Sequence, residues 1–211
     1  MKLADARKDH YRRLAKGQGY RARSAYKLLQ LDNSYRILKK GNKVVDLGCA
    51  PGGWLQIATK QVGDFGKVVG IDLRPVEPVH GAAILQGNIE DSSMMERIIE
   101  ILGGKADVVL SDLAPNVSGV WDVDHARQIF LTKAALAFAT KALREGGSAV
   151  LKVFEGDMLN EFKAELRKNF GKVLLSKPTA SRQESSELYL VCLNFLPQNT
   201  SRFHSNQITV E

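Results

Sequence analysis

One lysine of the sequence lies in an apolar segment, where a charged side chain is energetically unfavourable. Lys152 interrupts the apolar run Ala-Val-Leu-Lys-Val-Phe at residues 149–154. A charged side chain in such a run needs a partner or a cavity, because moving it out of water without compensation is unfavourable. A lysine whose pKa is lowered by burial or by another cation can accept a proton from a hydroxyl group. Lys152 is therefore a candidate general base.

A glycine-rich turn follows an apolar segment near residue 45, in the sequence VVDLGCAPGGW. Gly48, Gly52 and Gly53 surround the turn, and glycine lets the backbone approach a ligand closely. The spacing does not match G-x-G-x-x-G, because Pro51 occupies the turn and the glycine after Gly48 comes four residues later. This difference argues against a dinucleotide pyrophosphate loop and so against a nicotinamide-dependent oxidoreductase.

Three polar residues end or follow the next apolar segments. Asp72 ends VVGIDL and can accept hydrogen bonds from ribose hydroxyls, as acids at this place do in nucleotide-binding sheets. Asn88 follows the third segment, where an amide can donate to and accept from an adenine edge or simply form a turn. Asp112 follows the fourth segment. These positions predict a ligand crevice at one edge of a sheet.

The elements that must position these residues are predicted from the alternation of apolar runs with amphipathic stretches. Strands are expected at residues 43–47, 68–72, 83–86, 106–111, 148–154, 172–176 and 188–195, and helices at 23–31, 54–62, 92–102, 123–143 and 157–169. This order predicts an α/β fold with a doubly wound, mostly parallel seven-stranded sheet and ligands at the carboxyl ends of its strands. The last two strands are too close in sequence for a helical crossover, so we expect an antiparallel last strand.

Length and composition indicate one domain over residues 1–211, with 44% hydrophobic and 25% charged residues. The amino terminus lacks the apolar region of a signal peptide and no run is long enough to cross a membrane, so we expect a cytoplasmic protein. Cys49 and Cys192 and the four histidines show neither a disulfide framework nor metal-ligand spacing. We expect no metal.

Charge is unevenly distributed along the chain. Residues 1–43 contain 13 Lys and Arg against 3 Asp and Glu, whereas the rest contains 17 against 20. A basic segment of this density can contact RNA phosphates, for which Arg7, Lys8, Arg12, Arg13, Arg21 and Arg23 are the candidates, or it can form a solvated helix. The polar tail at residues 197–211 is expected to be peripheral.

Three motifs, DLGCAPGGW, SDLAPNVSG and VLKVFEG, together with RSAYKL before them and SSELYLV after them, resemble the RrmJ/FtsJ family of ribose 2′-O-methyltransferases. The resemblance runs from Arg21 to Phe195. It implies a Rossmann-like, class I methyltransferase that uses S-adenosyl-L-methionine to methylate a ribose 2′-hydroxyl of RNA. The RNA expected from the family is a uridine of large-subunit ribosomal RNA within the large ribosomal subunit, and the enzyme is expected to act as a monomer.

The resemblance also assigns residues. The family's catalytic Lys-Asp-Lys-Glu tetrad corresponds to Lys27, Asp112, Lys152 and Glu187, with Lys152 as the proton acceptor. Its cofactor contacts correspond to Gly48, Gly52, Trp54, Asp72, Asn88 and Asp112. One departure is Asn88, because familiar bacterial members have aspartate there. Trp54 is equally compatible with helix–sheet packing.

The sequence is also compatible with three other functions. The same tetrad serves ribose methylation of transfer RNA and of the messenger RNA cap. A non-catalytic RNA-binding or ribosome-assembly factor could retain the sheet and the basic segment, although a binding module has no need of a lysine in an apolar strand.

Overall fold

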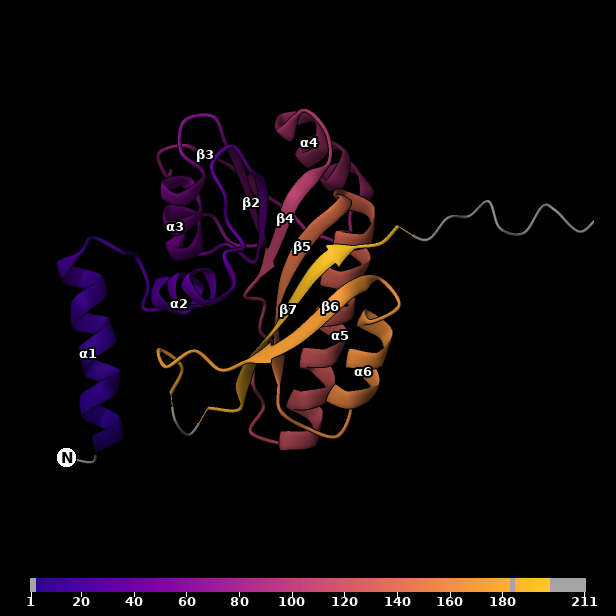
Figure 1. Ribbon diagram of the computed structural model, residues 1–211. Coiled ribbons are helices and arrows are strands. Elements are labelled where there is room, and N and C mark those ends of the chain that lie inside the picture. Colours follow the sequence, from indigo (N-terminus) through magenta and orange to yellow (C-terminus); the bar gives the residue numbers. More distant parts are fainter. Residues whose placement is uncertain (1–2, 183–184, 198–211) are drawn as a thin grey trace, which may run out of the picture.

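The computed structural model describes the backbone of residues 3–182 and 185–197, with side chains from His10 onward in the same ranges. At its centre is a seven-stranded sheet with strand order β3-β2-β1-β4-β5-β7-β6 (Figure 1). The strands are β1 (Lys43–Leu47), β2 (Lys67–Asp72), β3 (Ala82–Gln86), β4 (Ala106–Ser111), β5 (Leu143–Phe154), β6 (Phe170–Ser176) and β7 (Glu187–Phe195). The helices are α1 (Leu3–Gly17), α2 (Ala25–Tyr35), α3 (Gly53–Val62), α4 (Ser92–Leu102), α5 (Trp121–Ala142) and α6 (Leu159–Leu166).

Strands β1 to β5 pair in parallel, and β7 alone points in the direction opposite to the other strands. It lies between β5 and β6 and is antiparallel to both. The predicted α/β fold with a mostly parallel seven-stranded sheet and an antiparallel last strand is confirmed. Since β7 runs in the opposite direction, its first residues lie beside the carboxyl end of β5.

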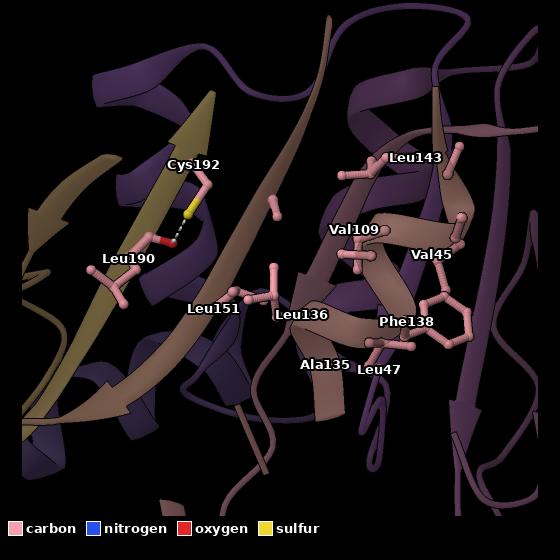
Figure 2. Packing of buried hydrophobic residues seen from close by; sticks show 14 of the residues in the cluster. Val45, Leu47, Val109, Ala135, Leu136, Phe138, Leu143, Leu151, Leu190 and Cys192 are labelled. Carbon is pink, nitrogen blue, oxygen red and sulfur yellow. Dashed lines mark hydrogen bonds between the residues drawn. The ribbon is translucent and has the colours of Figure 1, made fainter. Parts of the chain in front are cut away.

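Helices cover both faces of the sheet: α2 and α3 lie on one face, and α4, α5 and α6 on the other (Figure 1). Alternate strand residues contribute to two apolar cores, so that Val44 packs with α2 and α3 whereas Val45 packs with α4 and α5. Figure 2 shows the second core, where Phe138 of α5 lies close to Val45 and Leu47 of β1. Central strands buried on both faces explain the continuous apolar runs in the sequence.

Several element boundaries differ from those predicted. Strand β5 begins at Leu143, five residues before the predicted start at residue 148. The Arg144 side chain pairs with Asp107 of β4 at 2.6 Å and so extends the pairing past two glycines. Helix α6 is shorter than expected and spans Leu159–Leu166. Helix α2 continues to Tyr35, beyond the predicted end at residue 31.

Helix α1 lies in the basic segment, for which a solvated helix was one of two interpretations. It was not among the helices predicted from apolar periodicity, because its sequence is dominated by polar residues. Its described part packs through Ala15, Tyr11 and Leu14 against Tyr26 and Ala180. The exposed side chains on it include Arg12 and Lys16. The side chains of Arg7 and Lys8, and the tail at residues 198–211, lie outside the described residues.

Two of the arginines predicted to contact RNA are used within the protein. Arg21 donates to the carbonyl oxygens of Glu77 and Pro78, both at 2.6 Å, and Arg23 donates to that of Ala180 at 2.7 Å. These bonds tie the segment before α2 to loops of the sheet. These two arginines therefore have a structural role in addition to the RNA contact that the sequence predicts for them.

Both cysteines are buried free thiols. Over the described ranges, no helix combines the length and the apolar character needed to cross a membrane.

The packing around α5 predicts a large loss of stability for Phe138→Ala. Phe138 is 2% exposed in the larger core, so truncation should leave a cavity and lower the free energy of unfolding by about 3–5 kcal/mol. Urea denaturation measures this change. Phe65→Ala is the matched control, because Phe65 is 94% exposed and its loss should cost little. Equal effects of the two changes would contradict the packing described here.

Candidate active site

Four charged side chains from four separate elements meet at one edge of the sheet. Lys152 Nζ lies 3.1 Å from Asp112 Oδ1 and 3.2 Å from Glu187 Oε1. The other oxygen of Glu187 accepts a hydrogen bond from Lys27 Nζ at 2.7 Å. The structure thus brings together all four residues of the predicted tetrad in a chain of alternating charge: Lys27, Glu187, Lys152, Asp112.

The sheet register explains this meeting. Asp112 directly follows β4, whose last residue Ser111 pairs with Leu151 of β5, so Asp112 lies beside Lys152. Glu187 begins β7 and pairs with Phe154, while Tyr189 pairs with Lys152. Alternate residues of a strand share a face, so Glu187 and Tyr189 both face the lysine side.

Both lysines are almost fully enclosed: Lys27 is 7% exposed and Lys152 is 6% exposed. Burial alone would lower the pKa of Lys152, but the nearby Asp112 and Glu187 carboxylates outweigh it and raise that pKa. Burial likewise works to raise the pKa of Glu187, but Lys152 and Lys27 lower it to about 2. Lys152 and Glu187 therefore stabilise each other's charged form.

The sequence left the resting protonation state of Lys152 open, and the positions of the carboxylates now decide it. Glu187 lies between the two lysines and contacts both. A carboxylate so placed cancels the effect of the second cation. Lys152 consequently rests as an ammonium group.

The backbone of Lys152 is held from the opposite face of the sheet. Its carbonyl oxygen accepts hydrogen bonds from Thr132 Oγ1 at 2.8 Å and from Gln128 Nε2 at 3.0 Å, both on α5. Gln128 is fully buried and Thr132 is 1% exposed. These two polar residues of a largely apolar helix fix the end of β5 on which the lysine stands.

Tyr189 is a member of the site that the sequence analysis missed. Its hydroxyl donates to Asp112 Oδ1 at 2.7 Å, and its ring lies 5.9 Å from Lys27 Nζ and 5.8 Å from the Trp54 ring. Burial, with the Asp112 charge nearby, raises the pKa of Tyr189 well above its ordinary value, so the hydroxyl stays protonated and donates. Its position two residues after Glu187 could have identified it, because alternate residues of a strand share a face.

A cavity of about 640 Å³ opens beside Asp112, at the carboxyl ends of β1, β2 and β4. Its lining includes Gly48, Asp72, Asn88 and Asp112 of the predicted cofactor contacts, together with Ile71, Leu73, Ile89, Leu113, Ala114 and Pro115. Gly48 has φ = 74°, and a Cβ there would come within 2.6 Å of the Leu113 side chain. Only glycine allows this loop to lie so close to the cavity wall.

The polar residues of the cavity differ in how firmly they are held. Asp72 is 8% exposed and accepts from the backbone N–H groups of Ala50 and Arg74, both at 2.9 Å, which fixes its carboxylate at the edge of the glycine-rich turn. Asn88 is exposed, and its side-chain oxygen accepts from Glu90 N at 3.1 Å. Asn88 therefore forms the turn that was its alternative interpretation while also lining the cavity.

Gly52 and Trp54 lie outside the cavity lining. Trp54 is 3% exposed, packs in the core with Tyr189, and donates from Nε1 to the carbonyl oxygen of Ser24 at 2.8 Å. Its side chain therefore has the packing role. Gly52 precedes the first turn of α3, and a Cβ there would come within 3.0 Å of Arg21. A cofactor contact by either residue stays a prediction and would involve the backbone at the start of α3.

Asp46 is a buried acid of the same loop to which the sequence analysis gave no role. It is fully buried in β1, and neither carboxyl oxygen has a hydrogen-bond partner among the described residues. Burial, with Asp112 and Asp72 on the flanking strands, raises its pKa well above the ordinary value.

A second hollow, of about 860 Å³, is lined by Arg21, Lys40, Lys60 and neighbouring residues of α3. No tetrad residue lines it, so the smaller cavity is the candidate ligand site. The described residues contain no cluster of histidine, cysteine, aspartate and glutamate that could hold a metal ion.

Comparison with known proteins agrees with this geometry. The profile of the FtsJ-like methyltransferase family matches residues 20–195, which covers most of the chain. The chain belongs to the FtsJ-like methyltransferase family. Membership makes it a methyltransferase and implies a methyl donor.

Two relatives illustrate the likeness within this methyltransferase family. The chain is 52% identical to the ribosomal RNA large subunit methyltransferase E of Nitrosopumilus maritimus, over 93% of this chain and 100% of that protein. It is also 52% identical to the protein of the same name from Methanothrix thermoacetophila, over 90% of this chain and 73% of that one.

A solved structure shares the arrangement of this FtsJ-like chain. It is a Plasmodium falciparum protein assigned provisionally as a ribosomal RNA methyltransferase, with a TM-score of 0.78 and 34% identity over 85% of this chain and 100% of that one.

The charge balance of the tetrad predicts a pH-dependent stability loss for Glu187→Gln. At neutral pH the change should lower the free energy of unfolding by about 1.5–3 kcal/mol, because two enclosed lysines lose a shared charged acceptor. The folded-state pKa of Glu187, about 2, lies below its ordinary value of 4.5. The stabilisation is therefore complete above that ordinary pKa and is lost as the pH falls through about 2.

Chemical denaturation of both proteins across this pH range measures the difference. Glu145→Gln serves as the control, because Glu145 is exposed and should give a small difference throughout. A wild-type advantage over Glu187→Gln that stays constant down to the lowest pH would contradict an ionised Glu187 between the two lysines.

Proposed function

We propose that this enzyme transfers a methyl group from S-adenosyl-L-methionine to a ribose 2′-hydroxyl of RNA, namely a uridine of large-subunit ribosomal RNA. The observation that carries the proposal is the position of Lys152, which is held between two carboxylates, one of which, Asp112, lines the cavity. The names of the relatives support the ribosomal RNA substrate. Action within the large subunit, a monomeric state and a cytoplasmic location stay predictions that accompany this proposal.

The cavity fits the donor that we propose. Ribose hydroxyls would donate to Asp72, whose oxygens each accept one backbone N–H and whose Oδ1 also lies 3.5 Å from Arg74 Nε. The flat adenine would lie between Leu73, Ile89 and neighbouring apolar side chains, with its edge near Asn88. The methionine end would reach the start of α3, where first-turn N–H groups have no acceptor within the helix.

Asp112 connects the two halves of the site. It lines the cavity and also contacts Lys152 and Tyr189. When bound, the donor supplies an electrophilic methyl group on a positively charged sulfur. The carboxylate of Asp112 would stabilise that charge, and the charge would in turn weaken the hold of Asp112 on the Lys152 ammonium group. Lys152 could then lose its proton more readily than in the resting site.

We assign the proton-transfer step to Lys152. A ribose hydroxyl is a poor nucleophile until its proton is drawn away, and the attacking oxygen must lie in line behind the methyl group. The neutral Lys152 amine would accept that proton, while Lys27 and Glu187 would position the ribose and the lysine. Because the pKa of Lys152 is raised, only a small fraction is neutral at neutral pH, so the rate should rise with pH.

The exposed Arg12 and Lys16 on α1 support an RNA backbone track leading to the tetrad. Arg21 and Arg23 are weaker candidates for this contact than the sequence indicated, because protein carbonyl groups already hold them.

The cofactor proposal predicts that S-adenosyl-L-methionine binds the chain without RNA and that Asp72→Ala weakens binding by about 1.5–3 kcal/mol, the range for hydrogen bonds to a charged group. Isothermal titration calorimetry measures both values. Asp64→Ala is the control, because Asp64 lines the other hollow. Failure of the unaltered protein to bind would refute the proposed donor.

The substrate and the base are tested together by tritium transfer from labelled donor to fractionated RNAs and to isolated ribosomal subunits. We expect incorporation into large-subunit RNA, lost by at least roughly 10²–10⁴-fold in Lys152→Ala, since that is the usual contribution of a general base. Lys152→Arg should not restore activity, because a guanidinium group cannot accept the proton. Lys172→Ala, at an exposed lysine of β6, should retain it.

The outcomes separate the alternatives. Transfer only to transfer RNA or to capped messenger RNA would replace the proposed substrate. Donor binding without transfer to any fraction would favour a non-catalytic assembly factor. Near-normal single-turnover rates for Lys152→Ala would remove it as the base.

A further inference from the structure

An exposed tryptophan stands beside the tetrad without a role in the steps above. Trp121 begins α5 and is 47% exposed. Its ring lies nearly parallel to those of His125 and Phe154, with interplanar angles of 19° and 24° and centroid separations of 6.1 Å in both pairs. Such separations between nearly parallel rings mean partial overlap, so part of the indole surface stays open to solvent.

The surroundings of this ring are tightly organised. Asp124, one turn into α5, accepts hydrogen bonds from Ser118 N at 2.7 Å and Gly119 N at 3.0 Å, which fixes the loop leading to Trp121. His125 is 5% exposed and accepts from Met158 N at 3.3 Å. A Cβ at Gly156 would come within 2.6 Å of the His125 ring, so the chain passes directly against the imidazole.

Phe154 connects the aromatic stack to the tetrad. Phe154, which contacts Trp121, pairs directly with Glu187 across β5 and β7, and Lys152 lies two residues earlier on the same strand. A nucleotide whose ribose lies at Lys152 therefore has its own base, or that of a neighbouring nucleotide, within reach of the indole. This argument rests on the proposed function.

The local chemistry favours a base over a phosphate. Asp122 and Glu155, which adjoin Trp121 and Phe154 in sequence, are exposed acids that would repel the RNA backbone. Val117 and Val120 add exposed apolar surface in the same loop, at 70% and 57% exposure. Unpaired bases stack on aromatic side chains in proteins that recognise single-stranded RNA, whatever the base, because every base has a π face.

We propose that Trp121, supported by Phe154 and His125, is a stacking platform for an unpaired base at or next to the target ribose. The platform orients the nucleotide so that its 2′-oxygen faces the tetrad. Recognition then requires a nucleotide that is free of base pairing.

Tryptophan fluorescence tests the stack without any need for activity. The chain contains two tryptophans, and Trp54 is 3% exposed, so quenching by an added base reports mainly on Trp121. A short single-stranded oligouridylate should quench the emission, and the same ribose-phosphate oligomer without bases should not. Equal quenching by both oligomers would overturn the proposal.

Binding affinity for RNA oligomers provides the second readout. Trp121→Ala should weaken binding of a labelled oligouridylate by about 5- to 150-fold, the effect typical of one stacked base, and should leave binding of the base-free oligomer unchanged. Trp121→Phe should retain most of the affinity. Phe65→Ala, at an exposed aromatic residue in the turn before β2, is the matched control and should change nothing.

Methyl transfer to large-subunit RNA separates this inference from the proposed function. If the wild type transfers methyl groups and Trp121→Ala raises KM for RNA with donor affinity unchanged, the platform is supported. If the wild type is active and Trp121→Ala has normal KM and oligomer affinity, the platform is refuted while the proposed function stands. An inactive wild type would refute the proposed function, and the fluorescence comparison would still decide whether a base stacks on Trp121.

Discussion

The site depends on one constraint, the pairing of two almost fully buried lysines with two carboxylates. Lys27 is 7% exposed and Lys152 is 6% exposed, and the carboxylates reach them only because four elements converge at one edge of the sheet. An ion pair lacking one partner in such a place is strongly destabilising. The packing of α2, β4, β5 and β7 and the electrostatics of the tetrad therefore depend on each other.

Much of the fold and part of the site could be predicted from the sequence. Apolar runs located all seven strands within a few residues, because strands buried on both faces contain few polar positions. The run around Lys152 identified a lysine that needed partners. Helix α1 was predicted only as one interpretation of the basic segment, because few of its residues are apolar. The start of β5 was missed because the Arg144–Asp107 pair, rather than apolar side chains, holds it.

Other features depend on register and orientation, which periodicity does not specify. Tyr189 faces the tetrad because β7 is antiparallel and places Glu187 and Tyr189 on the lysine side. The protonation state of Lys152 depends on the position of Glu187 between the two lysines, a matter of a few ångströms. Likewise, composition does not distinguish an arginine that contacts RNA from one such as Arg21, which donates hydrogen bonds to carbonyl oxygens of the protein.

The place of β7 in the sheet has a consequence for biosynthesis. Lys27 and Glu187 are separated by 160 residues along the chain. The nascent chain therefore exposes both lysine positions long before their shared acid is synthesised, and contacts of such sequence separation form slowly. Since β7 inserts between β5 and β6, the sheet cannot close around it until β7 itself has been synthesised and has left the ribosome. Newly made molecules should thus assemble the complete tetrad only when β7 docks between its neighbours.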